Sequence, residues 1–590
     1  MAAVTKLGSE FQVNTTAAGA QDNPAIAALA NGGFVIAWES PDASSDGIFA
    51  QRYDANGGLD GIEMQINTTT TSQQTMPTIV GLSDGRFAVT WQSTQGTAFW
   101  QVITKIFAAD GNVTTDELRL DAVANNITNT SPRAAALANG YYAVAFSPID
   151  PSQTGIGVTI VKNDGTIDQS QTFANTFTTS YQRAPAIATL EDGGFVVIWE
   201  SYNQEAHSSG SYGVFGQRFD NTWSPVGDEF QVNLKESDDQ TNADVIGLAN
   251  GGFLVMWESV HVEDSPGASR GVVGRLYHQY GTSISAEINI NTTEYGAQDH
   301  VRATALPDGG FLVTWESFNQ DGSGAGVFGQ RFDANGAKLG GEFQVNTTSF
   351  STQSDPEVAV LANGGFVITW ESWGQDGDQI GVFAQRYKAQ LFGTTDDDTI
   401  SDDIGANWID GRSGNDDIHG NGGADVIRAG GGNDRVYGGA KNDIITGGTG
   451  LDSLDGEGGN DVIKGQGGAD EIDGGAGRDD LDGGKGDDVL KPGAGGDTVR
   501  GGGGADNFFF STSWNKNIVL DYQDGTDKIT LSGFNYADKD EALTHFHEIG
   551  GVNNNKVGFM DQGTEIIING ADLSDIRKSD IRLDDGLLIM

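Results

Sequence analysis

An acidic residue recurs at every ninth position between Gly393 and Phe509. Thirteen consecutive phrases of the form GGxGxDxUx, where U is apolar, keep a single register. Carboxylate oxygens at such regular intervals suit a hard cation such as Ca²⁺. The sixth position of the phrase holds Asp398, Asn407, Asp416, Asp425, Asp434, Asp443, Asp452, Asp461, Asp470, Asp479, Asp488, Asp497 and Asp506.

The same period predicts the elements that position these carboxylates. A nine-residue repeat is typical of a parallel β-helix in which each phrase forms half a coil. Glycine permits tight turns at positive φ, and the apolar eighth residue is expected to point inward and stack on its neighbours. The sixth-position side chains would then face one another along two turn columns. The eighth position holds Ile400, Ile409, Ile418, Ile427, Val436, Ile445, Leu454, Ile463, Ile472, Leu481, Leu490, Val499 and Phe508.

Solvated turn residues are the alternative interpretation of these aspartates. Columns of like charge would repel one another in the absence of a cation, so the pattern favours cation binding.

This stretch resembles the haemolysin-type calcium repeats of RTX proteins, which bacteria export by type I secretion. In that family each Ca²⁺ lies between successive turns of one column, held by backbone carbonyls and by sixth-position carboxylates. The resemblance implies this role for the twelve aspartates named above. Asn407 departs from the pattern and its phrase lacks the glycine pair, so we expect an incomplete site in the first coil. Pro492 stands where a later phrase requires its opening glycine.

A second repeat with a longer period precedes this stretch. Each copy is predicted to form four short strands. An Asn-Gly or Asp-Gly hairpin turn precedes the second strand, in a recurring segment such as NGGFVIAWES that is called the refrain here. Four strands per unit at a spacing of 53 to 58 residues predict a β-propeller blade. The aromatic anchors of the seven copies are Trp38, Trp91, Phe146, Trp199, Trp257, Trp315 and Trp370.

The two ends of this region predict how the ring closes. The seventh copy stops after its third strand at Tyr387, and the chain begins with an unclaimed fourth strand at Glu10–Thr16. If that strand completes the last blade, no sheet edge is left open. An open stack of β-sandwich repeats is the alternative. The sequence thus predicts an all-β chain: a seven-bladed β-propeller in residues 1–390, an RTX β-roll in 391–509 and a β-rich cap in 510–590.

Composition limits the function classes. The formal net charge of −49 argues against nucleic acid or an anionic membrane as a partner. The absence of cysteine excludes disulfides and thiolate metal sites. No apolar run is long enough for transmembrane insertion, and the start MAAVTKLGSEFQVN lacks the apolar core of a secretory signal. We therefore expect any export signal to lie elsewhere.

The last 80 residues are expected to cap the open end of the roll, as solenoids require. They resemble the C-terminal portion of serralysin-type and other type I substrates. That resemblance implies an uncleaved secretion signal near Ile581–Met590, the type I secretion apparatus as a partner and an extracellular location.

Charged residues recur in the propeller at equivalent places. By strand alternation Glu39 and Arg52 can form an ion pair across adjacent strands, and its recurrence in each blade favours a structural role. HExxH and GxSxG motifs are absent, and the histidines share no metal-ligand spacing, so we expect no catalytic residue and no cofactor besides Ca²⁺. The equivalents of this pair are Glu200, Glu258, Glu316, Glu371, Arg218, Arg331 and Arg386.

The loops between the second and third strands differ most and are expected to form one variable face. Tyr202, Phe318 and Trp373 follow the anchors there and suit carbohydrate stacking or a protein contact. Packing on a neighbouring blade is the alternative. The segments NQDGSG (319–324) and GQDGDQ (374–379) could hold further Ca²⁺.

Two functions follow from these observations. The first is a secreted, calcium-binding, non-catalytic protein of the cell surface or extracellular matrix: an adhesin, matrix or surface-layer component. Its propeller would be a platform for glycan binding or self-association, and its roll would fold on Ca²⁺ after export. The alternative is a secreted polysaccharide hydrolase or lyase with its site on the propeller. Titratable side chains of different blades that converge in one cleft would favour the enzyme.

Overall fold

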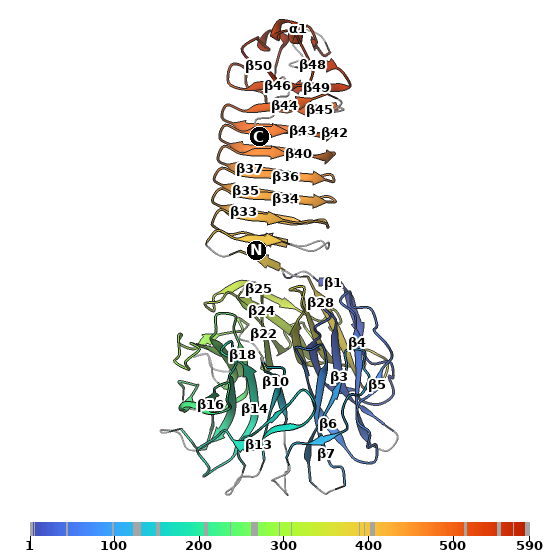
Figure 1. Ribbon diagram of the computed structural model, residues 1–590, viewed down its shortest axis with the longest axis vertical. Coiled ribbons are helices and arrows are strands. Elements are labelled where there is room, and N and C mark those ends of the chain that lie inside the picture. The colour runs from blue at the N-terminus through green and yellow to red at the C-terminus, as the bar shows by residue number, and fades with distance from the viewer. Residues whose placement is uncertain are drawn as a thin grey trace. The chain divides into compact units, whose positions relative to one another are not determined.

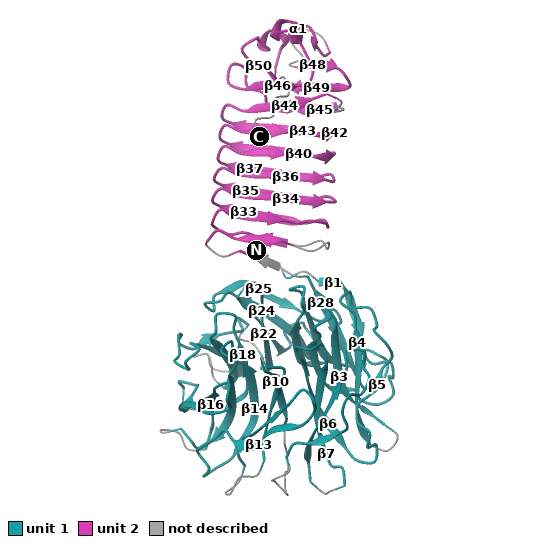
Figure 2. Cartoon of the chain, in the orientation of Figure 1, with its two compact units in different colours: residues 1–388 teal, residues 389–590 magenta. Residues whose placement is uncertain are grey.

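The computed structural model divides into two compact units, residues 1–388 and 389–590 (Figure 2). Asn407, His207, His261 and the last six residues of the expected secretion signal lie outside the described residues. The structure describes the whole chain except residues 1–3, 5, 43–44, 97–98, 122–130, 138, 149–153, 206–209, 236–237, 261–269, 294–295, 308, 389, 394–395, 402–407, 513–515, 551–555, 570 and 585–590.

The first unit consists of seven four-stranded antiparallel sheets (Figure 1), which confirms the seven-bladed propeller. Blades 1 to 6 take four consecutive strands each, from β2–β5 to β22–β25. The strands are β1 (Lys6–Gln12), β2 (Asp22–Ala28), β3 (Phe34–Pro41), β4 (Asp46–Tyr53), β5 (Met64–Gln65), β6 (Gln74–Gly81), β7 (Phe87–Ser93), β8 (Gln101–Phe107), β9 (Leu118–Arg119), β10 (Arg133–Ala136), β11 (Tyr142–Phe146), β12 (Gly157–Val161), β13 (Ile167–Phe173), β14 (Gln182–Thr189), β15 (Phe195–Tyr202), β16 (Tyr212–Phe219), β17 (Pro225–Gln231), β18 (Gln240–Gly247), β19 (Phe253–Val260), β20 (Arg270–Tyr277), β21 (Ile288–Asn289), β22 (Gln298–Ala305), β23 (Phe311–Phe318), β24 (Ala325–Phe332), β25 (Lys338–Gln344), β26 (Gln353–Val360), β27 (Phe366–Trp373) and β28 (Ile380–Tyr387).

Blade 7 joins the two ends of the unit. Its sheet has the order β1-β28-β27-β26, so the first strand of the chain supplies the outermost strand of the last blade. The pairing of β1 with β28 is antiparallel and places Lys6 opposite Tyr387 and Gln12 opposite Phe383. β28 therefore has a partner on both sides and presents no open edge.

The hydrophobic core of the propeller lies between adjacent blades. Trp38 of blade 1 packs in one cluster with Leu361 and Val367 of blade 7, and Trp91 of blade 2 packs with residues of blade 1. Both indole rings are almost fully buried. Because each blade buries one face against each neighbour, the refrain strands are apolar on both faces rather than alternating.

The innermost strand of each blade contacts the innermost strands of both neighbours. In six blades this strand begins with a bulge, and in blade 3 Ser131 holds the equivalent place just before the strand. One residue per bulge has φ between 35° and 53°, a left-handed conformation that is uncommon outside glycine. The register of blade 1 pairs Asp22 with Glu39 and Pro41 with Asp46, so the loop between the second and third strands lies on the same side of the ring, called here the bulge face. The bulge residues are Asn23, Met76, Ser131, Ala184, Asn242, His300 and Asp355.

The predicted Glu39–Arg52 ion pair is wrong. The register places Arg52 opposite Val35, four residues along the strand from Glu39, and the Arg52 guanidinium instead pairs with Asp60 at 2.8 Å. Glu39 accepts the backbone N–H of Met76 in the next blade at 2.6 Å. The recurrent glutamate therefore ties neighbouring blades together at the bulges. The same bond runs from Asn242 N to Glu200, from His300 N to Glu258 and from Asn23 N to Glu371.

We expect Glu39→Ala to lower the free energy of unfolding of the propeller by about 1–3 kcal/mol, because it leaves the partly buried Met76 N–H without its acceptor. Burial raises the pKa of Glu39 to about 8, so the side chain is largely neutral at pH 7. Glu39→Gln, which keeps the acceptor oxygen, should therefore cost less than about 1 kcal/mol. Thermal unfolding at pH 7 compares the two variants, and equal losses would contradict the acceptor role.

The second unit is a parallel β-solenoid whose strands stack as successive rungs (Figure 1), which confirms the β-roll. Two sheets alternate along the chain, with orders β29-β31-β33-β35-β37-β40-β43-β45-β49-β48-β47 and β30-β32-β34-β36-β38-β41-β44-β46-β50. The strands are β29 (Gln390–Phe392), β30 (Thr399–Ser401), β31 (Trp408–Asp410), β32 (Asp417–His419), β33 (Val426–Gly431), β34 (Arg435–Ala440), β35 (Ile444–Thr449), β36 (Ser453–Gly458), β37 (Val462–Gly467), β38 (Glu471–Asp473), β39 (Ala476–Gly477), β40 (Asp480–Lys485), β41 (Val489–Lys491), β42 (Ala494–Gly495), β43 (Thr498–Gly503), β44 (Asn507–Ser511), β45 (Lys516–Val519), β46 (Lys528–Ser532), β47 (Phe546–Glu548), β48 (Lys556–Asp561), β49 (Thr564–Asn569) and β50 (Ile581–Asp584).

The nonapeptide explains the coil residue by residue. All thirteen eighth-position side chains are buried in one continuous core, as predicted. Glycines at the second and fourth positions turn the chain at positive φ, as at Gly448 and Gly450. A Cβ on Gly468 would lie 1.4 Å from the Gly450 carbonyl oxygen one coil away. At Gly468 the fourth position therefore requires glycine for lack of space as well as for φ, whereas Lys441 occupies the fourth position of its own phrase at φ 96°.

The last coils form a cap. β45 and β46 continue the two sheets in parallel, and β49 and β48 add a hairpin at the end of one of them. A short helix α1 (Lys539–Leu543), capped by Asp538, and a 3₁₀ turn at Leu573–Asp575 complete it. Among the described residues no helix combines the length and the hydropathy needed to cross a bilayer.

Candidate calcium site

The sixth-position aspartates form two columns, one along each edge of the roll. In ten of the twelve, Oδ1 accepts the backbone N–H of the aspartate one coil earlier, for example from Asp452 N to Asp470 Oδ1 at 3.0 Å and from Asp461 N to Asp479 Oδ1 at 2.8 Å. The columns therefore hold their carboxylates in fixed orientations. One column contains Asp398, Asp416, Asp434, Asp452, Asp470, Asp488 and Asp506, and the other Asp425, Asp443, Asp461, Asp479 and Asp497.

The second oxygen of most of these carboxylates is buried without a hydrogen-bond partner. The aspartates from Asp416 onward are only 1–2% exposed, and where the phrase opens with glycine the Oδ2 atom lies close to that glycine. A Cβ on Gly465 would lie 2.3 Å from Asp470 Oδ2. A buried carboxylate oxygen without a partner is costly, and a cation would satisfy it. The oxygens concerned are Oδ2 of Asp416, Asp434, Asp443, Asp452, Asp461, Asp470, Asp479, Asp488, Asp497 and Asp506.

The raised pKa values of the aspartates in the columns favour the binding of a cation. Burial, together with the charge of the aspartates one coil away, raises the pKa of Asp443, Asp452 and Asp479 to about 7. The hydrogen bond from the backbone N–H opposes this rise without cancelling it. The metal-free roll therefore holds its carboxylates above their ordinary pKa, and a bound cation would remove the cause.

We expect the metal-free roll to lose stability as the pH rises from about 4 to about 7. The folded-state pKa values lie above those of the unfolded chain, so the folded state binds protons more tightly, and its penalty grows until the aspartates are ionised. Hydrogen–deuterium exchange of metal-stripped protein at pH 5 and pH 8, corrected for the intrinsic rates, compares the folded fraction of the roll. Greater stability at pH 8 would contradict it.

The structure extends both columns beyond the predicted residues. Asn517 Oδ1 accepts from Asp497 N at 3.0 Å, and Asp527 Oδ1 accepts from Asp506 N at 3.1 Å. Successive members of a column are 18 residues apart in the roll, and the cap adds two and three residues to this spacing. A search in the nine-residue register therefore does not find Asn517 and Asp527. Next to Asp527, the Lys528 ammonium donates to Asp580 Oδ1 at 3.2 Å, so one column ends beside a cation of the chain itself.

Pro492 does not interrupt its column, because Asp479 N still donates to Asp497 Oδ1 at 3.0 Å. Within the described residues no group of three or more His, Asp or Glu side chains is arranged to hold a metal ion. A cation in the columns would therefore need backbone carbonyls in addition to the carboxylates. Ca²⁺, which takes six to eight oxygen ligands of both kinds, fits this donor set.

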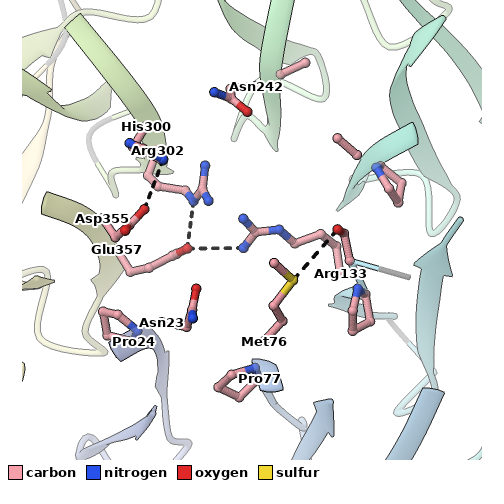
Figure 3. Close-up of a pocket in the computed structure, with 15 residues that line it drawn as sticks. Asn23, Pro24, Met76, Pro77, Arg133, Asn242, His300, Arg302, Asp355 and Glu357 are labelled. Carbon is pink, nitrogen blue, oxygen red and sulfur yellow. Dashed lines mark hydrogen bonds and ion pairs between the residues drawn. The ribbon is translucent and has the colours of Figure 1, made fainter. Parts of the chain in front are cut away.

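The channel along the propeller axis contains charged residues that the sequence analysis missed. The residues two places after the bulges form one layer of the ring, and four of these seven positions are charged. Glu357 Oε1 accepts from Arg302 Nε at 2.7 Å and from Arg133 Nη1 at 3.1 Å (Figure 3). Aligning the first strands of the blades would have revealed this asymmetry. The layer consists of Ala25, Thr78, Arg133, Ala186, Asp244, Arg302 and Glu357, of which all but Ala186 line a cavity of the channel.

His300, for which the sequence predicts no role, has two carboxylate neighbours. Its Nδ1 lies 3.2 Å from Glu316 and its Nε2 3.3 Å from Asp355 of the next blade. Hydrogen bonding to Glu316 and the nearby carboxylates raise the pKa of His300 to about 9, against the effect of burial. His300 is therefore a cation at neutral pH.

The aromatic residues expected on the variable face are partly exposed. Phe318 is 49% and Trp373 51% exposed, whereas Tyr202 packs against Tyr212 with ring centroids 5.0 Å apart. The two segments that could hold further Ca²⁺, 319–324 and 374–379, have aspartates that hydrogen-bond within their own turns. Asp321 Oδ1 accepts from Ser323 N at 3.2 Å, and Asp376 Oδ1 accepts from Asp378 N at 3.2 Å.

Stacked coils with two columns of buried aspartates define a calcium-binding β-roll. Residues 392–427, 428–463, 455–490 and 493–511 match the family model of the RTX calcium-binding nonapeptide repeat. The C-terminal unit thus carries RTX calcium-binding repeats, about a fifth of the chain. No curated protein sequence matches the chain significantly.

Among solved structures the chain is similar to a protein of unknown function from Dyadobacter fermentans, at 11% identity over 66% of this chain and 100% of that one, with a TM-score of 0.42. An α-L-arabinofuranosidase from Fusarium graminearum matches at 14% identity over 52% and 91%, with a TM-score of 0.38. The polysaccharide lyase Uly1 matches at 10% identity over 64% and 91%, with a TM-score of 0.40. At this level of similarity the matches carry no functional inference.

Proposed function

We propose that this is a secreted, non-catalytic binding protein whose β-roll folds on Ca²⁺ after export. The observation that supports it best is the ten buried carboxylate oxygens without a partner. Where free Ca²⁺ is scarce, the stacked aspartates repel and the roll stays unfolded enough to pass a type I secretion channel. At extracellular Ca²⁺ concentrations, ion binding supplies the folding free energy.

The residues that would hold the ions are the twelve sixth-position aspartates, Asp398 to Asp506, with Asp527 as an addition from the cap. Bound Ca²⁺ supplies the positive charge that the columns lack and cross-links successive coils. The segment from Ile581 to the C-terminus would carry the export signal. Its last described residues form β50, which pairs with β46.

The propeller would be the binding or assembly platform of an adhesin, matrix or surface-layer component. Its buried carboxylates support a non-catalytic role because they are already engaged. Glu39 and Glu258 accept backbone N–H groups of neighbouring blades, and Glu357 bridges two arginines. A glycosidase needs two carboxyl groups that are free to act on substrate.

A secreted polysaccharide-acting enzyme is the second candidate. The observation in its favour is convergence: His300 and Glu316 of blade 6 and Asp355 of blade 7 meet at the channel. Such a cluster could transfer protons if substrate reached it.

Two measurements separate these functions. Size-exclusion chromatography with light scattering, with and without millimolar Ca²⁺, tests assembly; large calcium-dependent assemblies support the surface-array or matrix role. A degradation screen with neutral and acidic polysaccharides tests the enzyme. Chain cleavage that is abolished by His300→Gln would overturn the non-catalytic proposal.

A further inference from the structure

The mouth of the propeller channel is a polar cavity of about 230 Å³. It is lined by residues from all seven innermost strands and lies at the bulges of those strands (Figure 3). Its volume is below the roughly 300–1,000 Å³ of pockets that hold drug-sized molecules. The cavity therefore has room for one small polar unit, such as a single sugar.

The two arginines at this cavity share one carboxylate at the mouth. Arg133 and Arg302 both donate to one oxygen of Glu357, whereas His300 has two carboxylate neighbours of its own. Asp244, the other acid of the same layer, attracts both arginines but lines a second cavity on the far side of the layer and not the mouth. At the mouth itself the two guanidinium groups therefore have only the Glu357 carboxylate between them.

Arg133 is the arginine placed to meet a ligand. Figure 3 shows its side chain extending from blade 3 across the cavity toward Glu357 of blade 7, past Met76. About a third of the Arg133 side chain is exposed, compared with 17% for Arg302. A guanidinium can bind a carboxylate in a bidentate manner while one of its N–H groups stays on Glu357.

Hydrogen-bond acceptors lie around the same cavity. Asn23 Nδ2 donates to Glu39 at 2.7 Å and Asn242 Nδ2 donates to Glu258 at 2.8 Å. Since each amide nitrogen is engaged, the amide oxygen is the group left to meet a ligand. These oxygens suit hydroxyl donors, and an anion that also carries hydroxyl groups is an acidic sugar.

We propose that the channel mouth binds a uronate unit of an acidic glycan. The Arg133 guanidinium contacts its carboxylate, and Asn23 and Asn242 accept from its hydroxyl groups. This inference rests on the proposed role of the propeller as a binding platform and names the ligand class of that platform. The half-exposed Trp373 and Phe318 lie on the same bulge face and would contact flanking sugars of a longer chain.

The test is isothermal titration calorimetry on the full-length, calcium-loaded protein. The probes are glucuronate- and galacturonate-containing oligosaccharides and their neutral counterparts. We expect the acidic probes to bind at least about tenfold more tightly than the neutral ones, and binding to weaken as salt rises. Arg133→Met should reduce affinity for the acidic probes by about tenfold or more, and Arg133→Lys by less.

The matched control is Arg86→Met. Arg86 pairs with Asp84 in the turn after β6, at the opposite end of the strand from the bulge, and its loss should leave binding unchanged. A melting temperature within a few degrees of wild type shows that each variant is folded. Equal binding of acidic and neutral probes, unchanged binding by Arg133→Met, or no binding of either probe would overturn the proposal. None of these results would affect calcium-dependent folding of the roll, which is measured separately.

Discussion

Replacement of Gly468 by alanine is expected to lower the free energy of unfolding of the calcium-loaded roll by more than about 3 kcal/mol. Gly468 has φ near +150°, and a Cβ there would lie 1.4 Å from the Gly450 carbonyl oxygen. The two stacked turns cannot both keep their positions, so the coil must open or the chain must fail to fold. Calorimetry of the full chain measures the loss, with the propeller transition as an internal reference.

The neighbouring glycine supplies the control. Gly467 has no positive φ, and the nearest atom to a Cβ built on it, the Gly448 carbonyl oxygen, is 3.7 Å away. Gly467→Ala should therefore change stability by less than about 1 kcal/mol. Equal effects of the two substitutions would show that the fourth-position glycine is not required by the close approach of the coils.

Replacement of Asp479 by asparagine is expected to change stability in opposite directions with and without calcium. The asparagine keeps the oxygen that accepts from Asp461 N and removes a charge from a column in which burial and neighbouring aspartates raise the pKa of Asp479 to about 7. The metal-free roll should become more stable at pH 8. The calcium concentration at the folding midpoint should rise by about tenfold or more, because a charged ligand is lost.

Asp480→Asn is the matched control, since Asp480 follows Asp479 directly but is exposed. It should leave the calcium midpoint within about twofold of wild type, because a screened surface charge contributes little. A fall in stability of Asp479→Asn in both conditions would indicate that Asp479 stabilises the coil independently of calcium.

The nine-residue period was sufficient to predict the roll because it is strictly local. Each phrase contains its own turn, inward side chain and carboxylate, so position in the phrase fixes position in the coil. Asn517 and Asp527 occupy the same columns yet escaped prediction, because insertions in the cap break the register. The seven-bladed ring was predictable for the same reason, since every blade repeats one refrain.

The propeller channel could not be predicted in the same way. Arg133, Arg302 and Glu357 come from three blades and up to 224 positions apart in the chain, and only ring closure brings them together. From strand alternation, Glu39 was predicted to pair with Arg52 of its own blade. In the structure it accepts the backbone N–H of Met76, at the bulge of the next blade. Contacts between blades depend on closure geometry rather than on the pattern within a blade.

Calcium-dependent ordering of the roll is the central claim, and hydrogen–deuterium exchange of the full chain in millimolar Ca²⁺ and in chelator tests it most directly. We expect backbone amides of residues 411–511 to be protected with Ca²⁺ and to exchange rapidly without it. Peptides of residues 6–387 should exchange alike in both conditions. Strong and equal protection of residues 411–511 with and without Ca²⁺ would contradict the account.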